Sequence, residues 1–130
     1  VADRFILLGS RDNPYPYYKA CDIYVHATKY EGKSIAIQEA QIIGLPIIAS
    51  DCSGNREQII DGVDGILCEF SEAGIAQAVT DMIADRRNWD GYCENASKKV
   101  CDKSIANVTS IPAPYTRISD STNATTIPIM

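Results

Sequence analysis

Short runs of apolar residues recur along the chain, separated by polar loops and by longer amphipathic segments. The runs cover residues 5–8, 23–26, 46–49 and 65–67. Unbroken apolar runs of this length, bounded by glycine and polar residues, are typical of strands buried on both faces of a parallel sheet. We therefore expect four short strands, and the brevity of the last one predicts that it lies at an edge.

Segments in which apolar residues recur at helical spacing alternate with these runs. We expect helices at residues 17–21, 34–43, 55–60, 72–84 and 88–101. The helix at 34–43 has the clearest boundaries, because Ser34 can cap its start, Gly44 suits a left-handed terminating residue and Pro46 prevents continuation. The remaining expected caps are Asn55, Ser71 and Asn88.

Alternating strands and helices predict an α/β fold, in which right-handed crossovers give a Rossmann-like parallel sheet flanked by helices. We assign residues 1–101 to this unit. Residues 102–130 are different, because serine, threonine and proline dominate and charges nearly vanish. Such a composition predicts a low-complexity, poorly ordered C-terminal tail.

Composition narrows the class of protein. The 130 residues, 45% hydrophobic and 22% charged, suit one globular domain. A net charge of -5 argues against a nucleic-acid partner. No apolar run is long enough for a membrane span and no signal peptide is visible, so we expect a cytoplasmic protein. Five cysteines without a C-x-x-C pair indicate neither a disulfide framework nor a zinc site, and we expect no metal and no cofactor.

The stretch from residue 22 to residue 40 has the layout of an anion-binding junction. It places a loop between an expected strand and an expected helix. The amides of Lys33, Ser34 and Ile35 would be unpaired donors at the helix N-terminus, where the macrodipole favours negative charge. Gly32 would let a ligand approach the backbone closely. This part of the chain therefore predicts a phosphate-binding turn.

Two acidic residues flank that turn. Glu31 stands in the loop, and Glu39 lies inside the expected helix. A carboxylate accepts hydrogen bonds strongly from sugar hydroxyls but cannot hold a phosphate. The amides and the carboxylates together therefore fit a ligand whose phosphate is flanked by hydroxyl-rich groups.

Glu31 and Glu39, separated by seven residues in the setting Tyr-Glu-Gly…Gln-Glu-Ala, resemble the Glu-x7-Glu signature of retaining GT-B glycosyltransferases, glycosyl transferases group 1. Further segments resemble blocks of that family in the same order, at residues 5–9, 18–23, 44–49 and 61–67. The resemblance implies that residues 1–101 are part of the C-terminal, nucleotide-sugar-binding lobe of a GT-B fold. The N-terminal acceptor-binding lobe and the opening strands of this lobe would be missing.

By this resemblance, the protein transfers a sugar from a nucleotide-diphosphate sugar to an acceptor hydroxyl, with retention at the anomeric carbon and without an obligatory metal. Glu31 would contact the hydroxyls of the donor sugar, and Glu39 would hold the ribose. The amides of residues 32–35 would stabilise the leaving diphosphate. A role for Glu31 as nucleophile is the weaker mechanism. A sugar or lipid-linked acceptor, polysaccharide or glycoconjugate synthesis and peripheral membrane association of the full-length enzyme are further expectations.

The sequence does not assign a single role to several residues near this junction. The resemblance places the loop after residue 9 near the nucleotide base, where Asn13 or Arg11 could contact the ligand. Thr28 is expected to line the cleft with its hydroxyl. Lys33 could add a cation to the pyrophosphate or use only its amide. His26, the single histidine, is as compatible with a structural role as with a functional one.

Two other functions are considered. A truncated lobe that binds a nucleotide sugar or a partner without turnover is the main alternative, and the isolated chain is expected to be inactive without the other lobe. A Rossmann-type dehydrogenase is disfavoured, because no Gly-x-Gly-x-x-Gly follows a strand.

Overall fold

The computed structural model describes residues 2–105 of the chain. The elements are, in order, η1 (Ala2–Arg4), α1 (Tyr15–Ala20), β1 (Tyr24–His26), α2 (Ile35–Ile43), β2 (Ile47–Ser50), α3 (Ser53–Arg56), β3 (Ile66–Cys68), α4 (Glu72–Ala84), η2 (Arg86–Asn88) and α5 (Trp89–Ile105).

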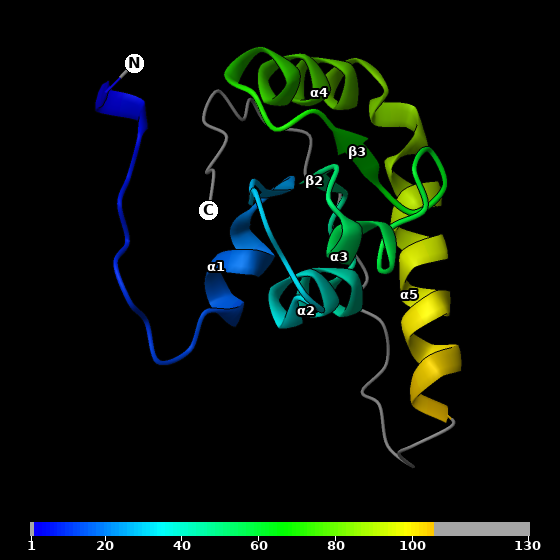
Figure 1. Ribbon diagram of the computed structural model, residues 1–130. Coiled ribbons are helices and arrows are strands. Elements are labelled where there is room, and N and C mark those ends of the chain that lie inside the picture. Colours follow the sequence, from blue (N-terminus) through cyan, green and yellow to red (C-terminus); the bar gives the residue numbers. More distant parts are fainter. Residues whose placement is uncertain (1, 106–130) are drawn as a thin grey trace.

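A parallel sheet in the order β1-β2-β3 lies at the centre of the structure (Figure 1). Tyr24 of β1 is opposite Ile47 of β2, and Ile48 of β2 is opposite Ile66 of β3. The central strand β2 is buried along its whole length, as expected for a strand covered on both faces. The expected position of the 65–67 run at an edge of the sheet is confirmed.

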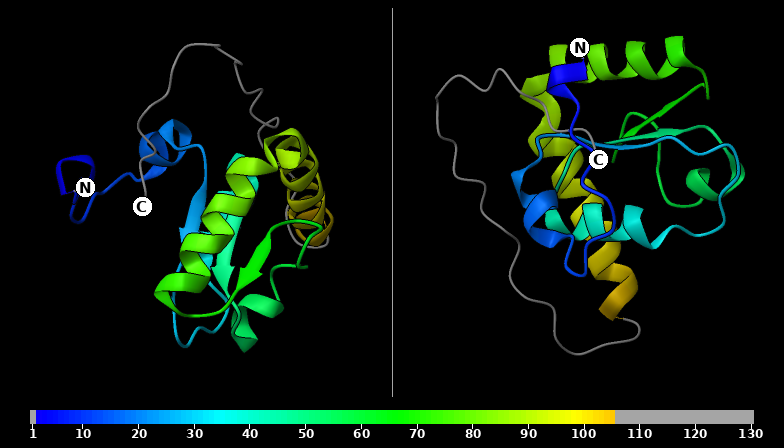
Figure 2. Two further views of the ribbon diagram at one scale, coloured as in Figure 1. Left: turned by 90° about the horizontal axis from the view of Figure 1, so that it is seen from above. Right: turned by 90° about the vertical axis from the view of Figure 1, so that its left-hand side faces the viewer.

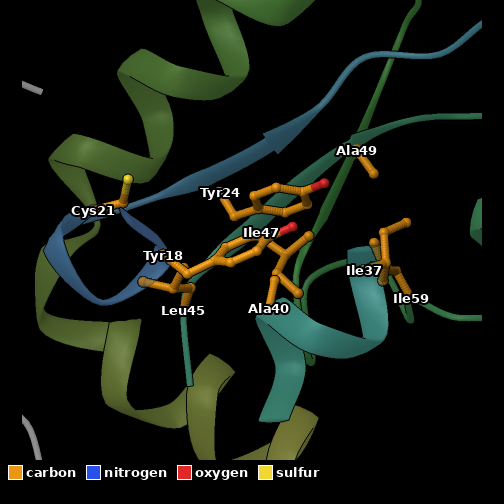
Figure 3. Packing of buried hydrophobic residues seen from close by; sticks show 9 residues of the cluster. All are labelled: Tyr18, Cys21, Tyr24, Ile37, Ala40, Leu45, Ile47, Ala49 and Ile59. Atoms are coloured by element: carbon orange, nitrogen blue, oxygen red, sulfur yellow. The ribbon is translucent and has the colours of Figure 1, made fainter. Parts of the chain in front are cut away.

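Helices cover both faces of the sheet, which makes three layers (Figure 2). Successive residues of β2 point to opposite faces, so Ile47 and Ala49 pack with α1 and α2 whereas Ile48 packs with α4. Figure 3 shows the first of these two cores, in which Tyr18 and Tyr24 lie beside the aliphatic residues. Helix α5 crosses α2 at a steep angle, contacts it and closes one side of the molecule (Figure 1). The expected α/β architecture is thus confirmed.

The run at residues 5–8 is not a strand, contrary to our prediction. These residues form an extended segment that runs apart from the sheet (Figure 1), and Phe5, Ile6 and Leu7 are 56%, 67% and 86% exposed. A strand needs a neighbouring strand for its backbone hydrogen bonds, and within the described residues β1 pairs only with β2. The apolar composition of the segment suits a buried strand, but composition alone does not show whether a neighbouring strand is there to pair with it.

Helix α2 has the boundaries that the sequence predicts. The hydroxyl of Ser34 accepts a hydrogen bond from the amide of Ile37 at 3.4 Å, and Gly44 ends the helix with φ of 84°. Helix α4 follows its cap in the same way, since Ser71 accepts from the amide of Gly74 at 3.0 Å. Both caps satisfy amides that the first turn of a helix leaves unpaired.

Other helix boundaries differ from our predictions. Asn55 does not cap a helix at 55–60: it lies inside the short helix α3, where its side chain donates to the carbonyl of Ser50 at 2.7 Å. Helix α1 begins at Tyr15, two residues early, because Pro16 fits a first turn that needs no amide donor. Helix α5 extends to Ile105, past the predicted end at residue 101. The predicted disordered tail lies, from residue 106 onward, outside the described residues.

All five cysteines are free thiols, and Cys21 and Cys68 are buried in the two cores. Burial raises the pKa of both thiols, so they stay protonated and behave as small apolar side chains. No helix within residues 2–105 combines the length and the apolar character that a membrane span requires.

We predict that Gly44→Ala destabilises the protein by about 1–2 kcal/mol, because a left-handed backbone brings a Cβ close to the following carbonyl. Gly91→Ala is the matched control. Gly91 lies inside α5 with open space at its Cβ, so this change should stabilise by roughly 0.5–1 kcal/mol. Urea unfolding monitored by circular dichroism measures both, and equal effects of the two substitutions would contradict the assigned helix end.

Candidate functional site

The loop between β1 and α2 carries Glu31, and Ser50 at the end of β2 holds the beginning of this loop. The amide of Thr28 donates to Ser50 Oγ at 2.9 Å, and Ser50 Oγ donates to the carbonyl of Thr28 at 2.5 Å. The Thr28 Oγ1 atom is buried and has no hydrogen-bond partner among the described residues. Its hydroxyl thus lies beneath the loop, while its backbone ties β1 to β2.

Gly54 in α3 sets the path of the same loop at its other end. A Cβ on Gly54 would overlap the carbonyl oxygens of Glu31 and Gly32. These obstructing atoms belong to the backbone, so they cannot rotate away as a side chain does. The absence of a side chain at Gly54 is therefore required for the observed position of Glu31.

The first turn of α2 is held by Gln58. Its Oε1 accepts from the amide of Ser34 at 2.6 Å, and its Nε2 donates to the carbonyl of Ser34 at 2.8 Å. The Ser34 amide is thus not the unpaired donor that we expected, because a buried side chain from 24 residues away reaches it. Ile35 and Ala36 have no intrahelical acceptor for their amides, as in any first turn.

Gln58 is fixed in turn by two other helices. Its carbonyl accepts from Gln41 Nε2 in α2 at 3.0 Å and from Lys99 Nζ in α5 at 2.7 Å. Lys99 also pairs with the buried carboxylate of Asp64 at 2.7 Å. A buried polar group needs such partners, so α5 contributes indirectly to the geometry at the start of α2.

Around this first turn, Gly32, Lys33 and Ile35 are exposed, and Ile35 shows 72% of its surface. The front of the helix is therefore open to solvent even though Ser34 itself is buried. Lys33 forms no ion pair with the described residues, so its cation remains available.

Glu31 is paired with His26. The His26 Nε2 and Glu31 Oε2 atoms are 3.0 Å apart, and the two side chains are 13% and 27% exposed. The other ring nitrogen, Nδ1, is 3.0 Å from the hydroxyl of Tyr24. The structure thus gives a definite contact to the histidine whose role the sequence left open.

Glu39 lies on the side of α2 that faces α1. Its Oε1 accepts from the hydroxyl of Tyr15 at 3.0 Å. This hydrogen bond raises the pKa of the Tyr15 hydroxyl, because an ionised phenol beside the carboxylate would be repelled. No lysine or arginine of the described residues pairs with Glu31 or Glu39; an imidazole contacts one acid and a phenol hydroxyl contacts the other.

The loop before α1 has a local role in the structure. Asn13 Oδ1 accepts from the amide of Tyr15 at 3.2 Å, and the Arg11 guanidinium lies over the Tyr17 ring at 5.7 Å. Arg11 and Tyr17 border a pocket of about 310 Å³ that the exposed segment 5–9 also lines. Neither contact involves Glu31 or Glu39 directly, but Tyr15, whose amide donates to Asn13, also donates its hydroxyl to Glu39.

Sequence reasoning did not find four residues that shape the junction, which are Ser50, Gly54, Gln58 and Lys99. Only Gly54 had a visible signal, since a glycine in a small polar loop after a strand can indicate close backbone approach. The partners of the other three are far away in sequence. No group of three or more potential metal ligands occurs within the described residues.

The family model for glycosyl transferases group 1 matches residues 1–85, which include the whole junction. The chain belongs to the group 1 glycosyltransferases. Among curated relatives of this family, the UDP-Gal:alpha-D-GlcNAc-diphosphoundecaprenol alpha-1,3-galactosyltransferase of Escherichia coli is 32% identical over 117 residues. That alignment covers 90% of this chain and 29% of the relative. The chain thus spans less than a third of a full group 1 glycosyltransferase of that length.

Solved structures of glycosyltransferases share this fold. HepE of Anabaena in complex with UDP has a TM-score of 0.72 and 26% identity, covering 78% of this chain and 28% of HepE. Its UDP-glucose complex has a TM-score of 0.66 and 27% identity, covering 73% of this chain and 27% of HepE. The C-terminal domain of a group 1 family protein (LpcC) from Francisella tularensis has a TM-score of 0.65 and 30% identity, covering 76% of this chain and 52% of that domain. The expected GT-B relationship is therefore confirmed at the level of the fold.

We predict that Gly54→Ala destabilises the protein by about 1–3 kcal/mol, because its methyl group must displace the Glu31–Gly32 backbone. Gly32→Ala is the control, since nothing lies within 4 Å of a Cβ there, and its effect should stay within about 0.5 kcal/mol. Urea unfolding measures both, and a Gly54→Ala variant as stable as the original would contradict the close approach.

We predict that Gln58→Leu destabilises by about 1–3 kcal/mol for each buried Ser34 backbone group that loses its partner. Hydrogen exchange of the Ser34 amide should also accelerate, because Gln58 is its acceptor. Gln77→Leu, on the exposed face of α4, is the matched control and should change stability by about 0.5 kcal/mol or less. Unchanged exchange at Ser34 in Gln58→Leu would exclude the proposed restraint.

Proposed function

We propose that this chain is the donor-binding part of a retaining glycosyltransferase that transfers a hexose from a nucleotide-diphosphate sugar to an acceptor hydroxyl. The observation that carries the proposal is the junction itself. Two partly exposed carboxylates, Glu31 and Glu39, flank an open helix N-terminus, and no lysine or arginine of the described residues pairs with either of them. Family membership and the sugar-nucleotide complexes of HepE support the same assignment.

In this proposal the two acids bind hydroxyl groups on opposite sides of the diphosphate. Glu31 binds the donor sugar through Oε1, since Oε2 is the oxygen that contacts His26. Glu39 binds the ribose hydroxyls while Tyr15 holds one of its oxygens. Hydrogen bonds to an ionised acceptor are stronger than neutral ones, which suits the recognition of a polyhydroxylated ligand.

The backbone of the junction binds the diphosphate. Gly32, Lys33 and Ile35, whose amides would bind it, are exposed at the front of α2, where the helix macrodipole favours an anion. As the glycosidic bond breaks, negative charge grows on the leaving diphosphate and these donors stabilise it. Ser34 contributes by capping the helix, because its own amide is bound to Gln58. The Lys33 ammonium, exposed beside them, is a further candidate for the diphosphate.

The remaining elements of the proposed reaction come from the family. Transfer with retention, an acceptor-binding N-terminal lobe and a cytoplasmic site of action are proposed on that basis. The name of the Escherichia coli relative specifies a diphosphoundecaprenol acceptor, so a lipid-linked sugar is the acceptor class that we propose to test first. Asn13 and Thr28 stay proposed ligand contacts, although Asn13 already accepts from the amide of Tyr15 and the Thr28 hydroxyl is buried.

We predict that the 130-residue chain binds a nucleoside diphosphate weakly and shows no detectable transfer by itself. Glu39→Ala should weaken binding about 10- to 100-fold, since a charge-assisted hydrogen bond contributes roughly 1.5–3 kcal/mol. Calorimetric titration with UDP, GDP and ADP measures the effect. Glu57→Ala, which removes an exposed carboxylate after α3, is the control and should bind normally. Equal affinity of the Glu39→Ala and Glu57→Ala variants would remove the ribose assignment.

The donor-sugar assignment has a separate test. We define the sugar increment as the ratio of the Kd for a nucleoside diphosphate to the Kd for its sugar conjugate. Glu31→Ala should reduce this increment about tenfold or more while leaving the affinity for the nucleoside diphosphate unchanged. A full sugar increment in Glu31→Ala would refute the role of Glu31, and a chain that binds no nucleotide would refute the proposal for the isolated chain.

A further inference from the structure

We infer that His26, itself held by Tyr24, is a positioning residue that fixes the Glu31 carboxylate for the donor sugar. The inference rests on the proposed contact between Glu31 and that sugar. His26 occupies one carboxylate oxygen, Oε2, and thereby directs the other oxygen, Oε1, to the ligand. No interaction with the ligand is assigned to His26 itself.

The backbone of β1 creates this arrangement. Residues two apart on a strand share one face of the sheet, so Tyr24 and His26 lie side by side. Their rings are stacked, with centroids 5.9 Å apart and an interplanar angle of 28°. Tyr24 is 7% exposed and packs beside Tyr18 in the core under α2 (Figure 3), so it cannot follow movements of the loop. The imidazole is therefore anchored on the rigid sheet, whereas Glu31 belongs to the loop.

The chemistry of the contact determines which nitrogen carries the proton. The pKa of Tyr24 is raised well above its ordinary value, mainly because the hydroxyl is buried and secondly because Tyr18 lies next to it. The hydroxyl of Tyr24 therefore keeps its proton. That hydroxyl donates to His26 Nδ1 when the imidazole is neutral. The Nε2 atom then carries the hydrogen and donates to the Glu31 carboxylate. The opposite tautomer would place a nitrogen lone pair against the carboxylate, which is repulsive.

A carboxylate fixed before the ligand arrives improves binding, because the ligand need not order a mobile side chain. Glu31 has no lysine or arginine partner among the described residues that could do this instead. A cation there would also compete for the same oxygens as the sugar hydroxyls. An imidazole in its neutral form donates one hydrogen bond to Glu31 and leaves the negative charge of the carboxylate to the ligand.

The first experiment is nitrogen NMR of His26 in the 130-residue chain, where the signal is unambiguous because the sequence contains a single histidine. We expect a protonated, pyrrole-type Nε2 and an unprotonated, pyridine-type Nδ1. Tyr24→Phe should give a mixture of tautomers because the donor to Nδ1 is lost. Tyr92→Phe removes a hydroxyl bound to Asp85 in another part of the fold and should leave the spectrum unchanged. A dominant Nδ1–H tautomer in the unmodified chain would overturn the inference.

The second experiment measures the sugar increment in two His26 variants. His26→Leu should lower it about tenfold without changing the affinity for the nucleoside diphosphate. His26→Gln, whose side-chain amide can donate to Glu31, should restore most of it. A full increment in His26→Leu, together with a lost increment in Glu31→Ala, would overturn the role of His26 and leave the proposed function standing. A full increment in both variants would instead refute the role of Glu31.

Discussion

A single buried side-chain amide holds the start of α2 in place. Gln58 accepts from the amide of Ser34 and donates to its carbonyl, so it pairs with the backbone as a neighbouring strand would. Because these groups are buried, leaving them unpaired would be costly, and the junction is therefore strongly restrained. Lys99 holds the backbone of Gln58 from α5. The direction of the first turn of α2 thus depends on a helix that begins at Trp89, 54 residues after the start of α2.

An imidazole and a phenol hydroxyl, rather than a lysine or an arginine, hold the two acids at this junction. His26 contacts Glu31 and Tyr15 contacts Glu39, so one acid is supported from β1 and the other from α1. A phenol hydroxyl, like an imidazole in its neutral form, donates a hydrogen bond without cancelling the charge of the carboxylate. In the function that we propose, the two carboxylates accept hydrogen bonds from hydroxyl groups, and the open helix N-terminus provides a favourable place for the diphosphate.

The sequence predicted helix boundaries correctly where they depend on residues that are close together in the chain. Ser34, Gly44 and Ser71 delimit their helices because capping depends on a few neighbouring backbone groups. The prediction failed at residues 5–8, which have the composition of a buried strand but no neighbouring strand among the described residues. It failed again at Asn55, where a side chain suited to capping instead donates to the end of β2.

For the candidate site, the sequence by itself determined the two glutamates, their spacing and the helix start between them, because these follow from local periodicity and from the order of residues. Only the tertiary structure decided that the Ser34 amide is occupied, that Gly54 makes room for the loop and that His26 contacts Glu31. The physical reason is that these contacts join segments brought together by packing, and a hydrogen bond or a steric overlap depends on distances that no local pattern encodes.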